Sequence, residues 1–349
     1  MNAKLLFLGD LYYDYEYVAE DIMDISKWIN DNDYHTILNL EGCIDCGRGT
    51  PIEKRGPNRK SNSNILEILK SLNVIGVCLS NNHIMDYGEE LLQSTCHVLK
   101  EKGILYVGAG KDLDEALAPM RLQSPFDDVI ILNYGWNVEE TIYATNNAAG
   151  CAPRDEHIIL EQIELAKKNA SKVIVCMHWG FEHNRLPMPY DIDLAHKMVD
   201  AGANLIIGHH PHCVQAKEVY KGVRIYYSLG NFYFASERKN FNAKYKEPIV
   251  NQADFGLAVC LDLSTGEFEE YLVEYVVDKD RSTIGYKQGV LEDITGVDYC
   301  SDAYLRQVKN RKRNINPVLT CNDVKDEKRL QRLFRYYAFK ARVKKILRK

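Results

Sequence analysis

Side chains that can bind metal ions or transfer protons occur where several apolar segments of the sequence end. Carboxylates follow the first two of these segments, and six of the ten histidines fall into three later clusters. In open α/β sheets, ligands bind outside the carboxyl ends of the strands. We therefore expect a metal site at this edge of the sheet. The clusters are Gly9-Asp10, Asn39-Leu40-Glu41, Asn81-Asn82-His83 with Asp86, His178-Trp179-Gly180 with Glu182 and His183, and Gly208-His209-His210-Pro211-His212.

The ligand types restrict the metal. Imidazole nitrogens combined with carboxylate and amide oxygens suit Mn, Fe or Zn, whereas Mg usually avoids imidazole. The clusters hold enough ligands for two divalent ions about 3.5–4 Å apart. Taken singly, each cluster has a simpler interpretation, because Asp10 could cap a helix and a histidine at a strand end could be an ordinary hydrogen-bonded residue. The convergence of five clusters favours the metal site.

The hydrophobic pattern predicts the elements that would position these residues. Short apolar segments alternate with segments of helical periodicity, which predicts an α/β fold. The predicted strands are 4–8, 36–40, 74–79, 129–133, 172–177 and 204–207, and the predicted helices are 18–29, 65–72, 89–102, 158–169 and 192–201. Four later segments follow one another without a helix between them and predict antiparallel strands, in a second sheet packed against the first. They are 213–219, 223–228, 255–263 and 267–277.

These clusters, together with Tyr87-Gly88 and Ser228-Leu229-Gly230-Asn231-Phe232, occur in order between residues 4 and 235. The set resembles the CapA-type (PGA_cap) capsule-synthesis proteins, which are associated with poly-γ-glutamate and belong to the calcineurin-like metallophosphoesterase superfamily. The resemblance implies an α/β fold with a four-layer α/β/β/α sandwich. We expect this domain to cover residues 1–278 and to be followed by a mainly helical C-terminal appendage, 279–349.

The resemblance also implies a role for each site residue. Asp10 and His212 would hold the first metal, Glu41 would occupy the bridging position, and Asn82, His178 and His210 would hold the second metal. His83 would be the general acid, positioned by Asp86, with Glu182 as a further catalytic residue. An activated water between the metals would attack phosphorus in line.

Two departures from the superfamily pattern concern the first metal. Its usual Asp-x-His motif is replaced by Asp10-Leu11-Tyr12, which lacks the imidazole, and the usual bridging aspartate is replaced by Glu41. We expect a metal-dependent, phosphoesterase-like hydrolase acting on an anionic polymer or a phosphorylated substrate in capsule synthesis or processing. Two alternatives remain open, a non-catalytic metal-binding assembly factor of a capsule machine and an amide hydrolase acting on a γ-glutamyl polymer.

The charge of the chain is unevenly distributed. The formal net charge is -5, but residues 328–349 carry ten Lys and Arg and no acid, which leaves about -15 on residues 1–327. This distribution excludes a uniformly basic nucleic-acid-binding protein. A basic amphipathic helix is predicted from Lys328, and it could dock on the acidic body, lie on an anionic membrane surface, or bind a protein or RNA partner. With no signal peptide or N-terminal anchor recognisable, we expect a cytoplasmic protein that could be peripheral at the inner membrane face.

A second cationic segment follows Glu41. It contains Arg48, Lys54, Arg55, Arg59 and Lys60, interrupted by glycines and prolines. Two interpretations are open, a solvated flexible loop and a clamp for a polyanion or phosphate beside the metal site.

Ten cysteines are scattered along the chain, and Cys43-Ile-Asp-Cys46 is a lone CxxC motif with no second pair. We expect reduced thiols rather than a disulfide framework.

Overall fold

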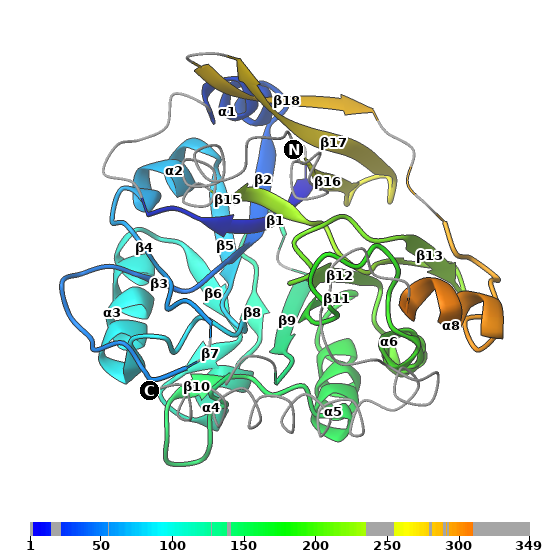
Figure 1. Cartoon of the computed structure of the whole chain (residues 1–349), viewed down its shortest axis with the longest axis horizontal. Coiled ribbons are helices and arrows are strands. Elements are labelled where there is room, and N and C mark those ends of the chain that lie inside the picture. Colours follow the sequence, from blue (N-terminus) through cyan, green and yellow to red (C-terminus); the bar gives the residue numbers. More distant parts are fainter. Residues whose placement is uncertain are drawn as a thin grey trace, which may run out of the picture.

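The computed structural model describes residues 3–14, 22–54, 56–126, 128–137, 141–234, 255–278, 281–288, 291 and 293–309. It is a mixed α/β structure, as the sequence predicts (Figure 1). The predicted basic helix from Lys328 lies outside the described residues. Within the described ranges, no helix combines the length and the apolar character that crossing a bilayer requires.

The first sheet has eight strands in the order β18-β17-β16-β1-β2-β5-β6, with β15 also paired to β1. β1, β2, β5, β6 and β15 run parallel, and β16, β17 and β18 are added in antiparallel pairs. The strands are β1 (Lys4–Tyr12), β2 (Tyr34–Leu40), β5 (Val74–Cys78), β6 (Leu105–Val107), β15 (Asn231–Phe234), β16 (Phe255–Asp262), β17 (Phe268–Asp278) and β18 (Arg281–Gln288).

The second sheet has six strands in the order β13-β14-β12-β11-β9-β8, and its four middle strands are parallel. They are β8 (Met120–Arg121), β9 (Val129–Gly135), β11 (Lys172–His178), β12 (Leu205–His209), β13 (Lys217–Tyr220) and β14 (Val223–Tyr226). Two small pairs are β3 (Cys43–Ile44) with β4 (Lys60–Ser61), and β7 (Ala109–Gly110) with β10 (Gly150–Cys151).

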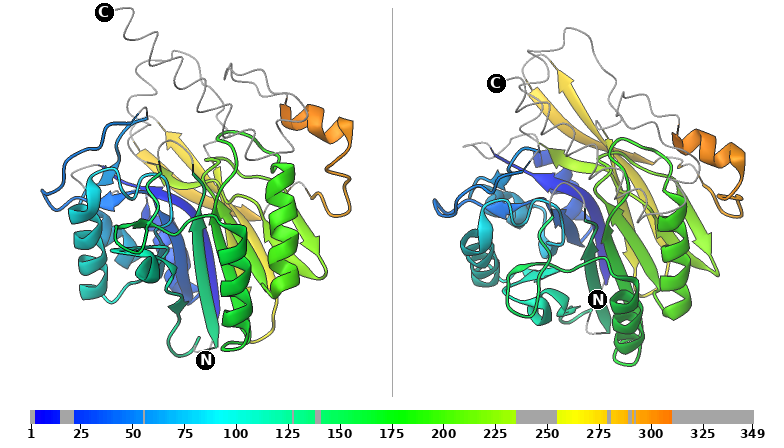
Figure 2. Two further views of the ribbon diagram at one scale, coloured as in Figure 1. Left: turned by 90° about the horizontal axis from the view of Figure 1, so that it is seen from below. Right: turned by 60° about the horizontal axis from the view of Figure 1, so that its bottom comes forward.

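Helices pack on both sheets (Figure 2). α1, α2 and α3 share a hydrophobic cluster with the first sheet, and α5 and α6 share another with the second. The helices are α1 (Met23–Asp31), α2 (Ile65–Ser71), α3 (Gly88–Glu101), α4 (Leu113–Leu117), α5 (Glu156–Lys167), α6 (Pro189–Ala201) and α8 (Asp302–Lys309). Each predicted helix is present with small shifts of its ends, although residues 18–21 of the first prediction lie outside the described residues.

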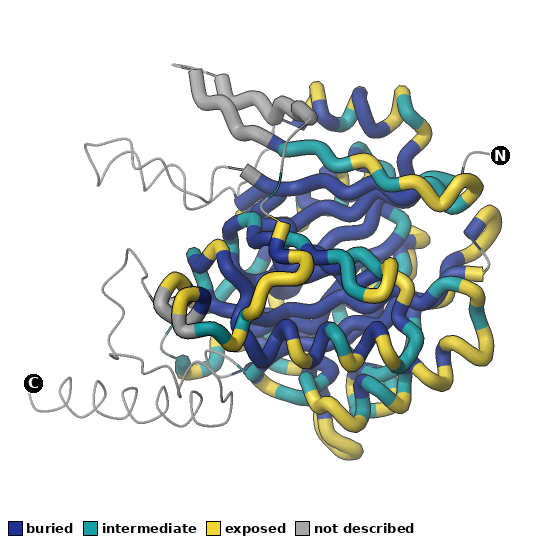
Figure 3. Tube along the Cα trace, turned by 90° about the vertical axis from the view of Figure 1, so that its right-hand side faces the viewer, coloured by how far each residue is buried: buried dark blue, intermediate teal, exposed yellow. Residues whose placement is uncertain are grey.

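The two sheets share a third hydrophobic cluster. Side chains alternate between the faces of a strand, so Leu5 and Phe7 of β1 join this shared cluster while Leu6 and Leu8 join the cluster with the helices. From β11, Ile174 is also in the shared cluster. Both faces of β1 are therefore covered, and its residues from Leu5 to Tyr12 are all buried. Figure 3 shows that buried residues, drawn in dark blue, make up most of the interior of the molecule.

The prediction that four antiparallel strands form a separate second sheet is wrong. β13 and β14 pair with each other, and β14 joins the second sheet in parallel with β12, whereas β16 and β17 extend the first sheet. The physical reason is that the parallel strands themselves divide into two sets, and each set leaves an edge on which later strands pair. The site-bearing strand ends therefore belong to two sheets.

The predicted appendage contributes to both sheets. β18 follows residue 278 and pairs along its own full length with residues 271–278 of β17. Asp293 forms an isolated backbone β-bridge with Lys217 of β13. Tyr304 of α8 packs in the hydrophobic cluster of the second sheet. The nine described cysteines are all free thiols, and Cys321 lies outside the described residues.

Candidate metal centre

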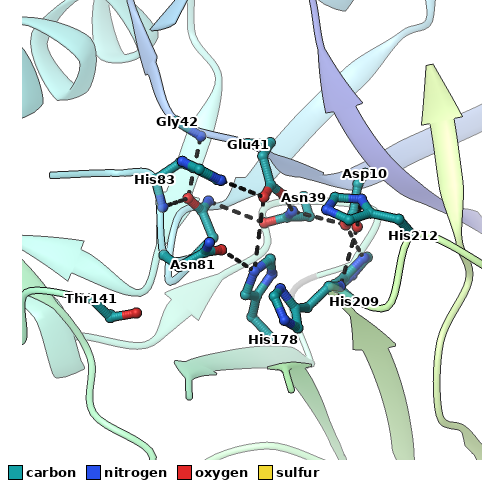
Figure 4. Close-up of polar contacts among 12 residues, drawn as sticks. Asp10, Asn39, Glu41, Gly42, Asn81, His83, Thr141, His178, His209 and His212 are labelled. Carbon is teal, nitrogen blue, oxygen red and sulfur yellow. Dashed lines mark hydrogen bonds and ion pairs between the residues drawn. The ribbon is translucent and has the colours of Figure 1, made fainter. Parts of the chain in front are cut away.

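Five of the predicted site residues are seen together in Figure 4, where parallel strands of both sheets end. They are Asp10, Glu41, His83, His178 and His212. Asp10 lies in the carboxyl-terminal part of β1, opposite Asn39 of the neighbouring β2, and Glu41 directly follows β2. His178 is the last residue of β11 and is paired in register with His209, the last residue of β12. The expected convergence of strand ends is therefore present, but it joins two sheets rather than one.

Three of the predicted metal ligands form the centre of this cluster. Asp10, Glu41 and His178 are buried, and each offers a ligand atom within 4.8 Å of the others. The Nε2 atom of His178 lies 3.9 Å from Oε1 of Glu41. One cation could therefore contact an imidazole and two carboxylates here.

The other three predicted ligands surround this centre. Oδ1 of Asn82 lies 2.9 Å from Nε2 of His178, and the rings of His178 and His210 are 4.8 Å apart. Nδ1 of His212 lies 3.5 Å from Oδ2 of Asp10. The structure thus brings all six predicted metal ligands into one buried cluster.

The hydrogen bonding of the cluster fits a cation. Among the described residues, Oε1 of Glu41 and Nδ1 of His210 are buried without a hydrogen-bond partner. An unsatisfied buried polar atom costs about 1–3 kcal/mol, and more when it is charged. A metal ion would satisfy such atoms, and the oxygen and nitrogen donors present suit Mn, Fe or Zn.

Burial also sets the charge states of the cluster. Burial and the nearby Asp10 carboxylate raise the pKa of Glu41 to about 8. Burial lowers the pKa of His210 to about 4, and burial together with the surrounding histidines lowers the pKa of His178. These two imidazoles are therefore neutral near pH 7, which is the form that binds metal.

Two residues that the sequence analysis did not assign hold the carboxylates in place. Nδ2 of Asn39 donates to Oδ1 of Asp10 and to Oε2 of Glu41, both at 2.8 Å. Nδ1 of His209 lies 3.1 Å from Oδ1 of Asp10. Burial alone would raise the pKa of Asp10, but His209, His212 and Asn39 together outweigh burial and lower it. The position of Asn39 could have been inferred from the sequence, because Asn39 lies two residues before Glu41 and alternate residues of a strand share one side.

The histidine loop after β12 has an unusual backbone. His210 and His212 adopt positive φ angles of 95° and 53°. Residues other than glycine rarely adopt such angles. The few that do are found especially often at functional sites. This conformation brings the backbone N–H of His210 to Oδ2 of Asp10, at 3.1 Å.

His83 and Asp86 form the predicted dyad. Nδ1 of His83 lies 2.6 Å from Oδ2 of Asp86, and Nε2 lies 3.9 Å from Oε1 of Glu41. The fully buried side chain of Lys54 joins the dyad, contacting Asp86 and lying 3.0 Å from Nδ1 of His83. Burial lowers the pKa of His83 to about 4, and the Lys54 charge acts in the same direction. The sequence placed Lys54 in the cationic loop but gave no sign of this contact.

Glu182 differs from the other predicted catalytic residues. Its side chain is 37% exposed, and its ion pair among the described residues is with His183, at 4.0 Å. Burial would raise the pKa of Glu182, but the charges of His212, His210 and His183 outweigh burial and lower it. Glu182 is therefore at the rim of the cluster and outside hydrogen-bond distance of the other predicted site residues.

A separate cavity of about 760 Å³ lies away from this cluster. It is lined by His35, Tyr106 and Phe126 among others, and no predicted site residue lines it. His35 is near the start of β2, whereas Glu41 follows its end. We therefore assign the candidate metal centre to the buried cluster rather than to this cavity.

Several curated proteins match about half of this chain. The chain is 37% identical over 177 residues to the "PGA biosynthesis protein CapA" of Bacillus subtilis, which covers 50% of this chain and 46% of that protein. It is 38% identical over 160 residues to the "Capsule biosynthesis protein CapA" of Bacillus anthracis, covering 45% and 39%. It is 32% identical over 167 residues to a "Probable polyglutamine synthesis accessory protein" of Mycobacterium tuberculosis, covering 44% of each.

The chain thus spans less than half the length of these curated relatives. The family model described as "Bacterial capsule synthesis protein PGA_cap" matches residues 3–236, about two thirds of the chain. This match includes every residue of the cluster and both flanking segments, the cationic loop and β15. The chain belongs to the PGA_cap family of bacterial capsule synthesis proteins.

Proposed function

We propose that this chain is a metal-dependent, phosphoesterase-like hydrolase that acts in the synthesis or processing of an anionic capsule polymer of the poly-γ-glutamate type. The names of the curated relatives support the link to the polymer. The position of His83 carries the catalytic part of the proposal. One ring nitrogen of His83 is held by Asp86 at 2.6 Å, while the other points toward the carboxylate cluster, 3.9 Å from Glu41.

Six side chains would hold two divalent ions, Mn, Fe or Zn, and these are Asp10, Glu41, Asn82, His178, His210 and His212. When bound, the ions would supply charge neutralisation and acidify a water molecule. In its protonated form, His83 would donate the Nε2 proton to the leaving oxygen and become the neutral ring, and Asp86 would keep the ring oriented through Nδ1. A general acid of this kind contributes about 10²–10⁴-fold to the rate. Glu182, at the rim, is proposed as a second proton-transfer group.

We further propose the four-layer α/β/β/α arrangement of the metallophosphoesterase superfamily for residues 1–278. The hydrophobic cluster shared by the two sheets and the separate clusters between each sheet and its helices support it. In this arrangement the two sheets would contribute ligands from opposite sides of the site.

The test combines metal analysis with substrate hydrolysis by the wild type and by His83→Ala. We expect two divalent ions per chain, hydrolysis of at least one phosphoester, and at least a 100-fold lower turnover in His83→Ala with unchanged metal content. His97→Ala is the matched control, because His97 is an exposed histidine on α3. Two bound metals with no turnover of any phosphoester, and no effect of His83→Ala, would exclude this function.

One observation favours the non-catalytic alternative, an assembly factor that uses the site for binding. Position 12 supplies a tyrosine where the superfamily motif has an imidazole, and burial raises the pKa of Tyr12 to about 12. Tyr12 is therefore a neutral phenol near pH 7 and a poor metal ligand. A panel that includes a γ-glutamyl oligomer distinguishes the three candidates, because amide cleavage without phosphoester cleavage would identify an amide hydrolase.

The partners follow from the same proposal. An anionic polymer or phosphorylated substrate would bind at the metal centre, and the cationic segment 328–349 would contact an anionic membrane surface or capsule-synthesis proteins. Flotation with anionic liposomes tests the membrane contact. Equal flotation of the full chain and of a chain ending at residue 327 would exclude it.

A further inference from the structure

The cationic loop between β3 and β4 is fixed beside the metal centre. β3 and β4 pair with each other and hold its two ends. Within the loop, the backbone N–H of Ile52 and the side-chain amide of Asn58 both donate to the backbone oxygen of Asp86, at 2.9 Å. The backbone N–H of Arg59 donates to Oδ2 of the same residue at 2.8 Å. The backbone of Arg59 is therefore anchored to the proposed general-acid dyad.

The described cations of this loop have different surroundings. Arg48 is exposed and lies 3.8 Å from Glu90, and Lys60 pairs with Asp45 at 2.7 Å. Lys54 is buried against Asp86. Arg59 lies over two aromatic rings, with its guanidinium carbon 5.0 Å from the centre of Tyr12 and 5.1 Å from the centre of Phe234.

These rings connect Arg59 with the metal centre. Tyr12 is two residues beyond Asp10 on β1, and the Tyr12 and Phe234 rings are 5.3 Å apart. The Phe234 ring also contacts the ring of His212, at 4.8 Å. Only one aromatic side chain thus separates the guanidinium of Arg59 from a proposed metal ligand.

A stacked guanidinium suits the recognition of an oxyanion. Guanidinium groups are weakly hydrated, stack on aromatic faces, and present a planar fork of N–H donors that matches two oxygens of a carboxylate or phosphate. Packing on the Tyr12 and Phe234 rings restrains the fork before a ligand arrives.

We propose that Arg59 binds an oxyanion of the substrate beside the metal centre, with Tyr12 and Phe234 holding its guanidinium in position. The proposal rests on the proposed function and adds a substrate contact to it. Phosphoryl oxygens and the side-chain carboxylates of a glutamate polymer share the chemistry that the fork recognises. In this arrangement Tyr12 holds the substrate-binding side chain of Arg59 in position and is not a metal ligand.

The test measures anion binding by the metal-loaded full-length chain, with inorganic phosphate and a γ-linked glutamate oligomer as two separate probes in calorimetry. Arg59→Gln is expected to weaken at least one probe by roughly 10–100-fold, the loss of a charge-assisted hydrogen-bonded contact. The probe whose binding is weakened by Arg59→Gln shows whether the oxyanion belongs to a phosphoryl group or to a carboxylate of the polymer. Arg59→Lys, which keeps the charge but not the fork, is expected to bind with intermediate affinity.

Arg48→Gln is the matched control, because it removes an arginine of the same loop that pairs with Glu90, and it is expected to bind within twofold of the wild type. Binding of both probes by Arg59→Gln and Arg59→Lys as tightly as by the wild type would overturn the inference, and so would a wild type that binds neither probe. Metal content and hydrolysis are measured in parallel. Weakened binding without any wild-type turnover would reject the hydrolase while supporting the role of Arg59.

Discussion

The ammonium group of Lys54 lies 3.0 Å from Nδ1 of His83, and both side chains are buried. Nδ1 is closer still to Oδ2 of Asp86, at 2.6 Å, and the Lys54 ammonium also contacts this carboxylate. A carboxylate accepts hydrogen bonds from both groups, whereas Nε2 of His83 faces Glu41 at 3.9 Å. Burial lowers the pKa of His83, and the positive charge of Lys54 acts in the same direction. Lys54 is therefore a positioning residue, which acts on His83 through the Asp86 carboxylate and through its own charge.

Lys54→Met is expected to raise the pKa of His83 above its wild-type value, because the variant removes a positive charge 3.0 Å from Nδ1 and keeps the Asp86 carboxylate. The ring is then protonated at a higher pH than in the wild type. A pH titration of the His83 ¹⁵N chemical shifts in both proteins measures this change. Equal pKa values in the two proteins would show that the Lys54 charge does not act on the ring.

The same substitution should lower the stability of the protein. Breaking a buried ion pair by removing one partner costs about 3–5 kcal/mol, because the remaining charge stays buried. Lys60→Met is the control, since the side chains of Lys60 and Asp45 are 29% and 33% exposed and such pairs contribute about 0–1 kcal/mol. Urea unfolding monitored by circular dichroism measures both. A loss below about 1 kcal/mol for Lys54→Met would show that the pair is not buried as described.

Asn39→Leu is expected to weaken metal binding without removing a ligand. Its amide holds Asp10 and Glu41 at 2.8 Å each, and loss of such a supporting contact typically lowers metal affinity about 10–100-fold. Titration with Mn²⁺ in a calorimeter measures this effect. Thr36→Val is the matched control, because Thr36 is a buried residue of the same strand whose hydroxyl bonds the backbone of Leu72. Equal affinities of the two variants would contradict the role of Asn39.

The convergence of the residues of the candidate metal centre was predictable, because the ends of strands can be recognised in a sequence. Apolar segments identify β1, β2, β5, β11 and β12, and parallel strands direct their carboxyl ends to a common edge. Asp10, Glu41, Asn82 and His178 follow from this rule without knowledge of the sheet order. The division into two sheets did not follow, because both faces of β1 are buried and its pattern does not reveal which strands flank it.

The surroundings of the loop cations could not be predicted from the sequence either. Lys54 and Arg48 lie in one segment rich in glycine and proline, yet one is fully buried and the other is exposed. Their burial differs because Lys54 contacts Asp86, a residue that follows β5 and forms hydrogen bonds with this loop. Local composition carries no information about such a pairing.

A final prediction concerns the backbone that carries Asp10. A methyl group at Gly9 would lie 2.0 Å from the backbone oxygen of Gly230, so Gly9→Ala must separate β1 from β15. We expect a loss of about 3 kcal/mol or more, at the upper end of the usual cost of overpacking. Mn²⁺ affinity should fall as well, because the backbone N–H of Asp10 bonds the same oxygen at 2.9 Å.

Gly76→Ala on β5 is the matched control for this experiment. Its added methyl group would meet the sulfur of Met120 at 2.6 Å, and a flexible methionine side chain can move away. We therefore expect Gly76→Ala to lose less than about 1.5 kcal/mol and to keep wild-type metal affinity. If Gly9→Ala were as stable as Gly76→Ala and bound Mn²⁺ equally well, the close contact between β1 and β15 would not be what fixes Asp10 at the metal centre.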